Sequence, residues 1–322
     1  MRRTRLGTST VEITELGFGA AAIGNLFTEV DPGQAAAAVD AAWDEGVRHF
    51  DTAPHYGLGL SERRLGEALR DRPRDAYTVS TKAGRLLDPL PPAQAAGLHG
   101  LSEGYAVPHT HGRRWDFSAD GIRRSVEDSL ERLGLDRVDI VHLHDPDDHG
   151  EAAFREGYPA LERLRAEGMV GAIGAGMNQT AMLTRFLRET DVDAVLCAGR
   201  FTLLDRSALD TLLPEALARG RSVVVGGVFN SGLLVDPRPG AMYDYATAPA
   251  PLLERAVRIR AVTEGHGVPL RAAALHFPLR HPAVAGALVG MRSPDEARDA
   301  AARLRTPIPD ALWDDLRAEG LL

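Results

Sequence analysis

The sequence predicts an α/β fold, a (β/α)8 barrel, because strand and helix patterns alternate along a single chain. Short β-rich runs alternate with longer helical stretches from about residue 16 to residue 305, and eight such pairs are present. Eight βα units in series imply a parallel sheet, and eight strands are the number that closes a barrel. The length of 322 residues suits one barrel, and a hydrophobic content of 44% allows a large core.

The expected strands are short apolar runs, several of which end in a polar residue. They are Leu16–Gly19, His49–Thr52, Tyr77–Lys82, Val138–His144, Val170–Ala175, Ala194–Cys197, Ser222–Val225 and Val284–Val289. The expected helices have apolar residues at helical spacing and charged residues between them. They lie near residues 33–45, 60–70, 119–133, 151–167, 180–189, 205–218, 251–279 and 294–304.

Three segments lie outside this repeat. Residues 3–14 alternate like an N-terminal β-hairpin, which we expect to plug the N-terminal end of the barrel, and residues 309–320 are expected to form an extra C-terminal helix. Residues 84–117 are rich in Pro and Gly and also carry aromatic side chains, so we expect a long loop that forms a wall or lid over the site. No low-complexity linker divides the chain, and residues 1–322 are interpreted as one domain.

Charge and cysteine content exclude several classes of function. The net charge is −8 and no long run of like charge occurs, which argues against nucleic acids and anionic membranes as partners. Cys197 is the single cysteine, so an internal disulfide is impossible and a reducing cytoplasm is expected. No apolar run follows the basic start and none reaches the ~18 residues of a membrane helix, so we expect neither a signal peptide nor a span.

Four polar residues that follow apolar runs are the candidate catalytic residues. Asp51 and Lys82 end the second and third expected strands, His144 ends the fourth, and Tyr56 lies just after the second. Catalytic groups of a (β/α)8 barrel come from the C-terminal ends of its strands, so these side chains can converge. An ammonium near a phenol favours the phenolate, and a neighbouring imidazole can donate a hydrogen bond to a carbonyl oxygen. The set predicts proton transfer at an oxygen whose carbon exchanges hydride.

Two motifs allow other interpretations. Gly17-Phe18-Gly19 matches the start of a dinucleotide-binding turn of a doubly wound sheet, but the third glycine and the downstream acidic residue are missing. His142-Leu143-His144 has the spacing of a metal-ligand pair, but the ends of strands five to seven offer no further ligands. We therefore expect no metal and place His142 inside the barrel or against a cofactor.

Several motifs resemble the aldo-keto reductase family over nearly the whole chain. GVRHFDTAPHYG at residues 46–57 resembles the family pattern G-x-x-x-(F/I)-D-T-A-x-x-Y-G, and DIVHLHDP at 139–146 resembles D-L-x-x-x-H-x-P. The segments 61–69, 80–82 and 125–134 also resemble family motifs. The resemblance implies a (β/α)8 barrel and nicotinamide-dependent interconversion of a carbonyl and an alcohol. It implies the tetrad Asp51, Tyr56, Lys82 and His144, with Tyr56 as the acid/base.

The resemblance also implies a cofactor site at the later strand ends. Asn178 replaces the usual Ser-Asn pair after strand five, and Phe229 and Gly232 lie in the turn after strand seven, which lacks the usual stacking aromatic. After strand eight, Ser293 and Glu296 form a capping box at a helix start that can attract a phosphate. The expected cofactor residues at this turn are Gly290, Met291, Arg292, Ser293 and Glu296. Met291 stands where a lysine often contacts the 2′-phosphate of NADP, so we favour NAD and leave NADP open.

Segments 116–121, 144–148 and 198–205 resemble the bacterial aldose 1-dehydrogenase branch of the family, which includes L-fucose and pyridoxal 4-dehydrogenases. This resemblance implies oxidation of an aldose such as L-fucose to its lactone, with Trp115, Asp145 and Arg200 as candidate substrate contacts. Oxidation of pyridoxal and NADPH-dependent reduction of aldehydes are alternatives. A nicotinamide-binding regulatory subunit without fast turnover is an alternative of another class.

Overall fold

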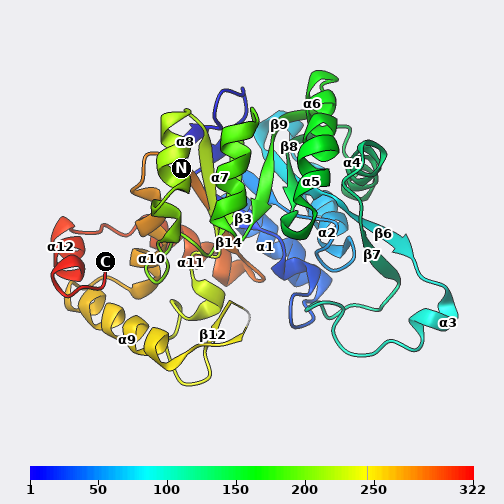
Figure 1. Cartoon of the computed structure of the whole chain (residues 1–322). Helices are drawn as coiled ribbons and strands as arrows, with labels where there is room; N and C mark the ends of the chain where they lie inside the picture. Colours follow the sequence, from blue (N-terminus) through cyan, green and yellow to red (C-terminus); the bar gives the residue numbers. More distant parts are fainter. Residues whose placement is uncertain (245) are drawn as a thin grey trace.

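The computed structural model describes residues 1–244 and 246–322 and contains a closed barrel of eight parallel strands (Figure 1). The barrel strands are β3 (Leu16–Gly19), β4 (His49–Asp51), β5 (Thr78–Ala83), β8 (Val138–His144), β9 (Val170–Met177), β10 (Ala194–Ala198), β11 (Ser222–Gly226) and β14 (Val284–Gly290). They follow one another around the barrel in chain order, and β14 pairs with β3 to close it. The predicted (β/α)8 architecture is confirmed.

Helices surround the barrel and bury the outer faces of its strands. They are α1 (Pro32–Asp44), α2 (Leu60–Leu69), α4 (Ala119–Leu133), α6 (Tyr158–Ala166), α7 (Thr180–Glu189), α8 (Leu212–Ala218), α10 (Leu270–Leu279) and α11 (Pro294–Leu304), and a single exposed turn, α5 (Gly150–Ala152), precedes α6. Helix α4 illustrates how the sequence defines them: Ser118 caps its first turn, and Gly134, at φ +66°, ends it. Ile122, Val126 and Leu133 are buried, and their helical spacing places them on the face that packs on the barrel.

One predicted helix is two. Residues 251–279 form α9 (Ala250–Gly265) and α10, separated by a break at Gly267 and Pro269. Gly267 has a φ of +70°, a left-handed conformation that favours glycine, and Pro269 cannot continue a helix through its missing N–H. The break lets α9 lie beside the C-terminal helix α12 (Asp310–Ala318), which was predicted near residues 309–320. Residues of α9, α10 and α12 form a second hydrophobic cluster beside the barrel, and Trp313 of α12 is buried in it.

The N-terminal hairpin closes the N-terminal end of the barrel, as the alternation at residues 3–14 predicted. Strand β1 (Arg3–Arg5) pairs antiparallel with β2 (Glu12–Thr14). Leu6 and Ile13 are buried together with side chains from inside the barrel. The backbone N–H of Gly7 donates to Ser222 Oγ over 2.9 Å, and Thr78 Oγ1 donates to the backbone oxygen of Glu12 over 2.8 Å. Because Ser222 and Thr78 begin two barrel strands, these bonds hold the hairpin across that end.

The segment 84–117 is not the plain loop that its Pro and Gly content predicted. Strand β6 (Arg85–Pro89) pairs antiparallel with β7 (His111–Trp115), and a short helix α3 (Pro92–Ala95) lies between them. This ribbon projects from one side of the barrel, at the right of Figure 1, opposite α9 and α12. A second ribbon, β12 (Met242–Tyr243) with β13 (Ala246–Thr247), lies nearer α9. No helix in the described part of the chain is long and apolar enough to cross a membrane.

Candidate active site

The four predicted catalytic residues meet at one mouth of the barrel. Asp51 and His144 are the last residues of β4 and β8, and Lys82 lies in β5, which pairs with both of these strands. Tyr56 lies in the turn between β4 and α2. Because parallel strands direct their carboxyl ends to the same edge, adjacent strands bring these side chains together.

Lys82 and Asp51 form a buried ion pair beneath the Tyr56 ring. Lys82 Nζ donates to Asp51 Oδ2 over 2.7 Å and to the backbone oxygen of Thr52 over 2.9 Å. Both side chains are at most 5% exposed. Lys82 Nζ also lies 4.7 Å from the centre of the Tyr56 ring. The ammonium is therefore held in a fixed position close to the phenol, where its charge favours the phenolate.

His144 faces Tyr56 from the neighbouring strand and is neutral. The two rings are nearly perpendicular, at 87°, with centroids 6.0 Å apart. Burial, and then the positive charges of Arg85 and Lys82, hold the pKa of His144 well below its usual 6.5. His144 Nε2 lies 3.6 Å from Asp145 Oδ2, but a neutral imidazole does not form an ion pair there. The ring can donate a hydrogen bond to a substrate oxygen without acting as an acid.

A cavity of about 760 Å³ opens above these residues. Its floor includes Tyr56, Lys82 and His144, and its walls come from loops that follow β3, β4, β5, β8 and β9. The side chains of the wall that were not predicted as catalytic include Leu26, Phe27, His55, Arg85, Glu103, Tyr105, Asp147, Asp148 and His149. His55 belongs to the motif at residues 46–57, but its contacts with Arg113 and Tyr105 come from a segment that is distant in the sequence. Burial, and then Arg85 and Arg113, lower the pKa of His55 to about 3, so it too is neutral.

Tyr105 reaches the cavity from a turn of the 84–117 segment that lies against residue Leu26. Its ring stacks on Tyr56 at 6.0 Å and 27°, and it is 3% exposed. Arg113 of β7 holds this turn, because its guanidinium donates to Ser102 Oγ and to the backbone oxygens of Ser102 and His55. Part of the segment is therefore a wall of the cavity.

Two of the three candidate substrate residues line the cavity. Asp145 follows His144 with a φ of +39°, which is strained for a residue other than glycine, and the Arg85 guanidinium donates to its carboxylate. Burial raises the pKa of Asp145, and Arg85 opposes that rise. Arg85 also stacks 4.1 Å above the Trp115 ring, which is 39% exposed. Arg200 is elsewhere: it pairs with Asp244 at 2.8 Å and does not line the cavity.

The predicted cofactor residues are divided between the cavity and the far side of the mouth. Asn178, just after β9, lines the cavity. Ser293 caps α11 by accepting from the N–H of Glu296 over 3.2 Å, whereas the Glu296 carboxylate accepts from the N–H of Arg292 over 2.7 Å. Met291 is fully buried in the core, so only its backbone is available to a ligand. A Cβ on Gly290 would meet nothing within 4 Å, which leaves open space beside the end of β14.

The turn after β11 contains a polar atom that sequence reasoning missed. Asn230 is 2% exposed and has a φ of +45°, and its Oδ1 has no hydrogen-bond partner among the described residues. Phe229 beside it is half-buried against two hydrophobic clusters and does not line the cavity. Gly232, at φ +98°, ends this turn. No sequence pattern distinguished Asn230 from the other polar residues of the loop.

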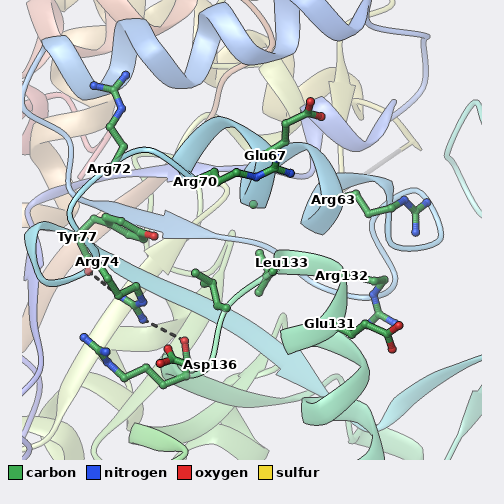
Figure 2. Close-up of a pocket in the computed structure, with 14 residues that line it drawn as sticks. Arg63, Glu67, Arg70, Arg72, Arg74, Tyr77, Glu131, Arg132, Leu133 and Asp136 are labelled. Carbon is green, nitrogen blue, oxygen red and sulfur yellow. Dashed lines mark hydrogen bonds between the residues drawn. The ribbon is translucent and has the colours of Figure 1, made fainter.

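A second groove lies on the outer surface between α2, α4 and residues 70–77, and arginines surround it (Figure 2). Most of these guanidinium groups are already paired. Arg72 bonds Asp40 and Arg74 bonds Asp139, each at 2.7 Å, and Arg132 bonds Glu62 at 2.5 Å. Their charges serve contacts within the protein, so the barrel mouth remains the candidate active site. No group of His, Cys, Asp or Glu in the described ranges has the arrangement of a metal site.

The aldo/keto reductase family model matches residues 15–318. The chain belongs to the aldo/keto reductase family. It is 46% identical to a D-threo-aldose 1-dehydrogenase from Pseudomonas sp over 96% of this chain and 95% of that protein. It is 40% identical to a pyridoxal 4-dehydrogenase from Microbacterium luteolum over 98% of this chain and 97% of that protein.

Solved structures of the family share the fold. An aldo-keto reductase from Bacillus halodurans in its holo form superposes with a TM-score of 0.76 at 26% identity, over 99% of this chain and 96% of that chain. A glycerol dehydrogenase from Gluconobacter oxydans superposes with a TM-score of 0.77 at 23% identity, over 99% of this chain and 94% of that chain, and supports the fold alone.

As an aldo/keto reductase, the protein is an NAD(P)-dependent oxidoreductase. Its residues fit a dinucleotide on the β9–β14 side of the mouth. The buried Asn230 Oδ1 lacks a partner among the described residues, and the start of α11 has a capped first turn beside the open space at Gly290. These groups match the polar demands of a nicotinamide cofactor and its phosphates.

Proposed function

We propose that this aldo/keto reductase oxidises the cyclic form of an aldose at its anomeric carbon and releases a lactone. The observation that carries the proposal is the carboxylate-lined cavity directly above the Tyr56–Lys82–His144 floor. Asp145 and Asp147 lie there beside the aromatic faces of Tyr105 and Trp115. Carboxylates accept from sugar hydroxyls, and aromatic faces pack on the apolar side of a sugar ring. The 46% identity to a D-threo-aldose 1-dehydrogenase supports the same substrate class.

In this reaction, Tyr56 is the group that receives the proton of the anomeric hydroxyl. Lys82, 4.7 Å from its ring centre, stabilises the phenolate before the transfer. Neutral His144 donates a hydrogen bond to the same substrate oxygen and so orients it between the two rings. Asn178 and Asn230 are the residues we expect to hold a bound nicotinamide cofactor, Asn230 through an Oδ1 that can accept from a ribose hydroxyl, and the cofactor would supply the hydride acceptor for the anomeric carbon. The products are a lactone, the reduced cofactor and a proton on Tyr56.

NAD is the proposed cofactor. The Glu296 carboxylate accepts a hydrogen bond from the backbone N–H of Arg292 and so lies at the start of α11. A carboxylate there can accept from the 2′-hydroxyl of NAD, and it repels the 2′-phosphate of NADP. Arg292 lies 3.7 Å from Glu296, so its positive charge is partly balanced.

The direct test is turnover of a panel of neutral aldoses, including L-fucose and D-arabinose, with NAD and NADP in separate reactions. We expect reduced-cofactor absorbance to rise with at least one sugar, faster with NAD, and a lactone to be detected as the product. Cofactor binding without turnover of sugars, pyridoxal or simple aldehydes would instead indicate a nicotinamide-binding regulatory subunit.

Pyridoxal oxidation is the second candidate. The 40% identity to a pyridoxal 4-dehydrogenase supports it, as do the flat aromatic walls Tyr105 and Trp115. Pyridoxal in the same panel separates the two candidates, because an aldose dehydrogenase has a higher kcat/KM for an aldose than for pyridoxal.

A further inference from the structure

A buried hydrogen-bond chain runs inside the barrel beneath the catalytic ion pair. His49 Nε2 lies 3.1 Å from Ser80 Oγ, and Ser80 Oγ donates to Asp51 Oδ1 over 2.8 Å. The other carboxylate oxygen, Asp51 Oδ2, accepts from Lys82. His49 is 2% exposed and Ser80 is 1% exposed, so the chain lies out of contact with solvent.

The strand geometry explains why these residues meet. His49 and Asp51 are two residues apart on β4, and Ser80 and Lys82 are two residues apart on β5, so each pair shares the inner face of the barrel. The register pairs Asp51 directly with Ser80. Gly17 of β3 makes room for the imidazole, because a Cβ there would lie 2.9 Å from His49 Nδ1.

The direction of the chain follows from counting protons. Ser80 has one hydroxyl proton and donates it to the carboxylate, which can only accept. His49 Nε2 must therefore carry the proton in its bond to Ser80. Burial lowers the pKa of His49 to about 4, so the ring is neutral and holds this single proton on Nε2 at neutral pH.

We propose that Ser80, oriented by His49, is a positioning residue that sets the ionisation of Tyr56 through Asp51 and Lys82. The Ser80 hydroxyl fixes the rotation of the carboxylate, so that Oδ2 stays directed at Lys82. The positive end of the Ser80 O–H dipole also points at Asp51, on the side of the barrel mouth. Both effects favour the Tyr56 phenolate that the proposed aldose oxidation requires, and the inference rests on that proposed function.

The groups that face Tyr56 or its ion pair come from several elements, and all of them bear on its ionisation. They are Lys82 from β5, Asp51 from β4, His55 from the same turn, Tyr105 and Glu103 from the 84–117 segment, Arg85 from β6, and His142, His144 and Asp145 from β8 and its loop. A substitution of Ser80 removes none of these side chains and acts on them only through the Asp51 carboxylate that the hydroxyl orients. A change in the ionisation of Tyr56 is then caused by loss of the Ser80 hydroxyl from the His49–Ser80–Asp51 hydrogen-bond chain.

The test compares Ser80→Ala with a matched control on the same strand. Thr81 Oγ1 donates over 2.8 Å to Glu62, a buried carboxylate that pairs with Arg132, so Thr81→Val removes an equivalent bond on the outer face of the barrel. The main readout is the pH dependence of kcat for the best aldose. We expect Ser80→Ala to move its inflection upward by about one pH unit and to lower kcat about tenfold at neutral pH. Thr81→Val should retain the wild-type inflection, and Ser80→Thr, which keeps the hydroxyl, should restore it.

A second readout does not depend on turnover. The ultraviolet absorbance of tyrosinate, measured during titration of the apo-protein and corrected with Tyr56→Phe, isolates the ionisation of Tyr56 among the six tyrosines. We expect the same upward shift in Ser80→Ala. If no aldose is turned over but this shift occurs, the proposed substrate is wrong and the positioning role stands.

Two outcomes would overturn the inference. One is a Ser80→Ala protein in which the kcat profile and the tyrosinate titration both have the wild-type inflection. The other is a Thr81→Val protein that shifts both inflections as much as Ser80→Ala does. If Ser80→Ala does not fold, nitrogen-15 NMR of the wild-type imidazoles decides the matter. We expect a neutral His49 with its proton on Nε2 from about pH 5 to about pH 9, and a proton on Nδ1 would refute the chain.

Discussion

The ring of Tyr105 stacks on the ring of Tyr56, with centroids 6.0 Å apart and planes inclined by 27°. The two residues are far apart in the sequence, and Arg113 fixes the approach by bonding the turn that carries Tyr105. Tyr105 therefore places an aromatic face beside the proposed acid/base Tyr56, where it can pack on a bound sugar ring and shield the phenol from water.

Tyr105→Ala should impair substrate binding more than the chemical step. Aromatic pairs contribute about 0.5–1.5 kcal/mol beyond their buried area, so we expect KM for the aldose to rise roughly tenfold and kcat to fall by less. Steady-state kinetics measure both constants. Tyr105→Phe, which retains the ring, is the matched control and should stay close to wild type; an equal loss in this variant would mean that the hydroxyl matters rather than the stack.

Tyr56→Phe should abolish most of the turnover and leave cofactor binding intact. General acid–base catalysis contributes roughly 10²–10⁴-fold, so kcat should fall by about that factor. Quenching of protein fluorescence by NADH measures binding separately. Turnover near the wild-type rate would show that another group moves the proton.

Asp145→Asn should separate sugars from simple aldehydes. The amide tolerates the left-handed backbone at this position but removes the charge that pairs with Arg85. We expect kcat/KM to fall about tenfold for the aldose and much less for an aldehyde without hydroxyl groups. Asp148→Asn changes an exposed carboxylate of the same cavity and provides the comparison. Equal losses on both classes of substrate would argue against a hydroxyl contact at Asp145.

Glu296→Gln should shift the cofactor preference toward NADP. Removing the carboxylate at the start of α11 removes its repulsion of a 2′-phosphate and frees Arg292 from its neighbour at 3.7 Å. The ratio of kcat/KM for NAD to that for NADP should fall several-fold. The surface variant Asp295→Asn tests whether any loss of negative charge near this helix has the same effect; if the ratio is unchanged in Glu296→Gln, the residue does not read the ribose.

Acid should destabilise the protein through its buried histidines. Burial lowers the pKa of His142 and of His55 to about 3, from an ordinary value of 6.5. Below about pH 6.5 the unfolded chain therefore binds protons that the folded protein does not. The free energy of unfolding has its full value above that pH and decreases as the pH falls toward the histidine pKa values of the folded protein. Each such histidine contributes a slope on the order of 1 kcal/mol per pH unit.

Urea unfolding at a series of pH values measures this dependence. His142→Gln should flatten the slope by one histidine's share, because the amide does not titrate. His266→Gln makes the same substitution outside the core, at a residue that contacts Asp315, and its slope is compared with that of His142→Gln. An unchanged slope in His142→Gln would mean that His142 is protonated in the folded protein.

Much of the fold was predictable because its signals are local. The eight barrel strands lie within a residue or two of their predicted bounds. Short β-branched runs between helices, such as Ser222–Gly226, are typical of buried parallel strands. The predicted helix near 251–279 was wrong because Gly267 and Pro269 were read as internal to it. The ribbon within residues 84–117 was missed because its two strands pair across a long insertion, and a pairing of that kind leaves little trace in composition.

By itself, the sequence determined the barrel, the strand ends that carry Asp51, Lys82 and His144, and the family. These features depend on alternation and on motifs within a few residues of one another. The tertiary structure decided what surrounds them: the stack of Tyr105 on Tyr56, the pair of Arg85 with Asp145, the position of Arg200 outside the cavity, and the chain from His49 through Ser80 to Asp51. Each of these depends on strand register or on loop packing. Both bring together side chains that are distant in sequence, and no local pattern encodes their distance.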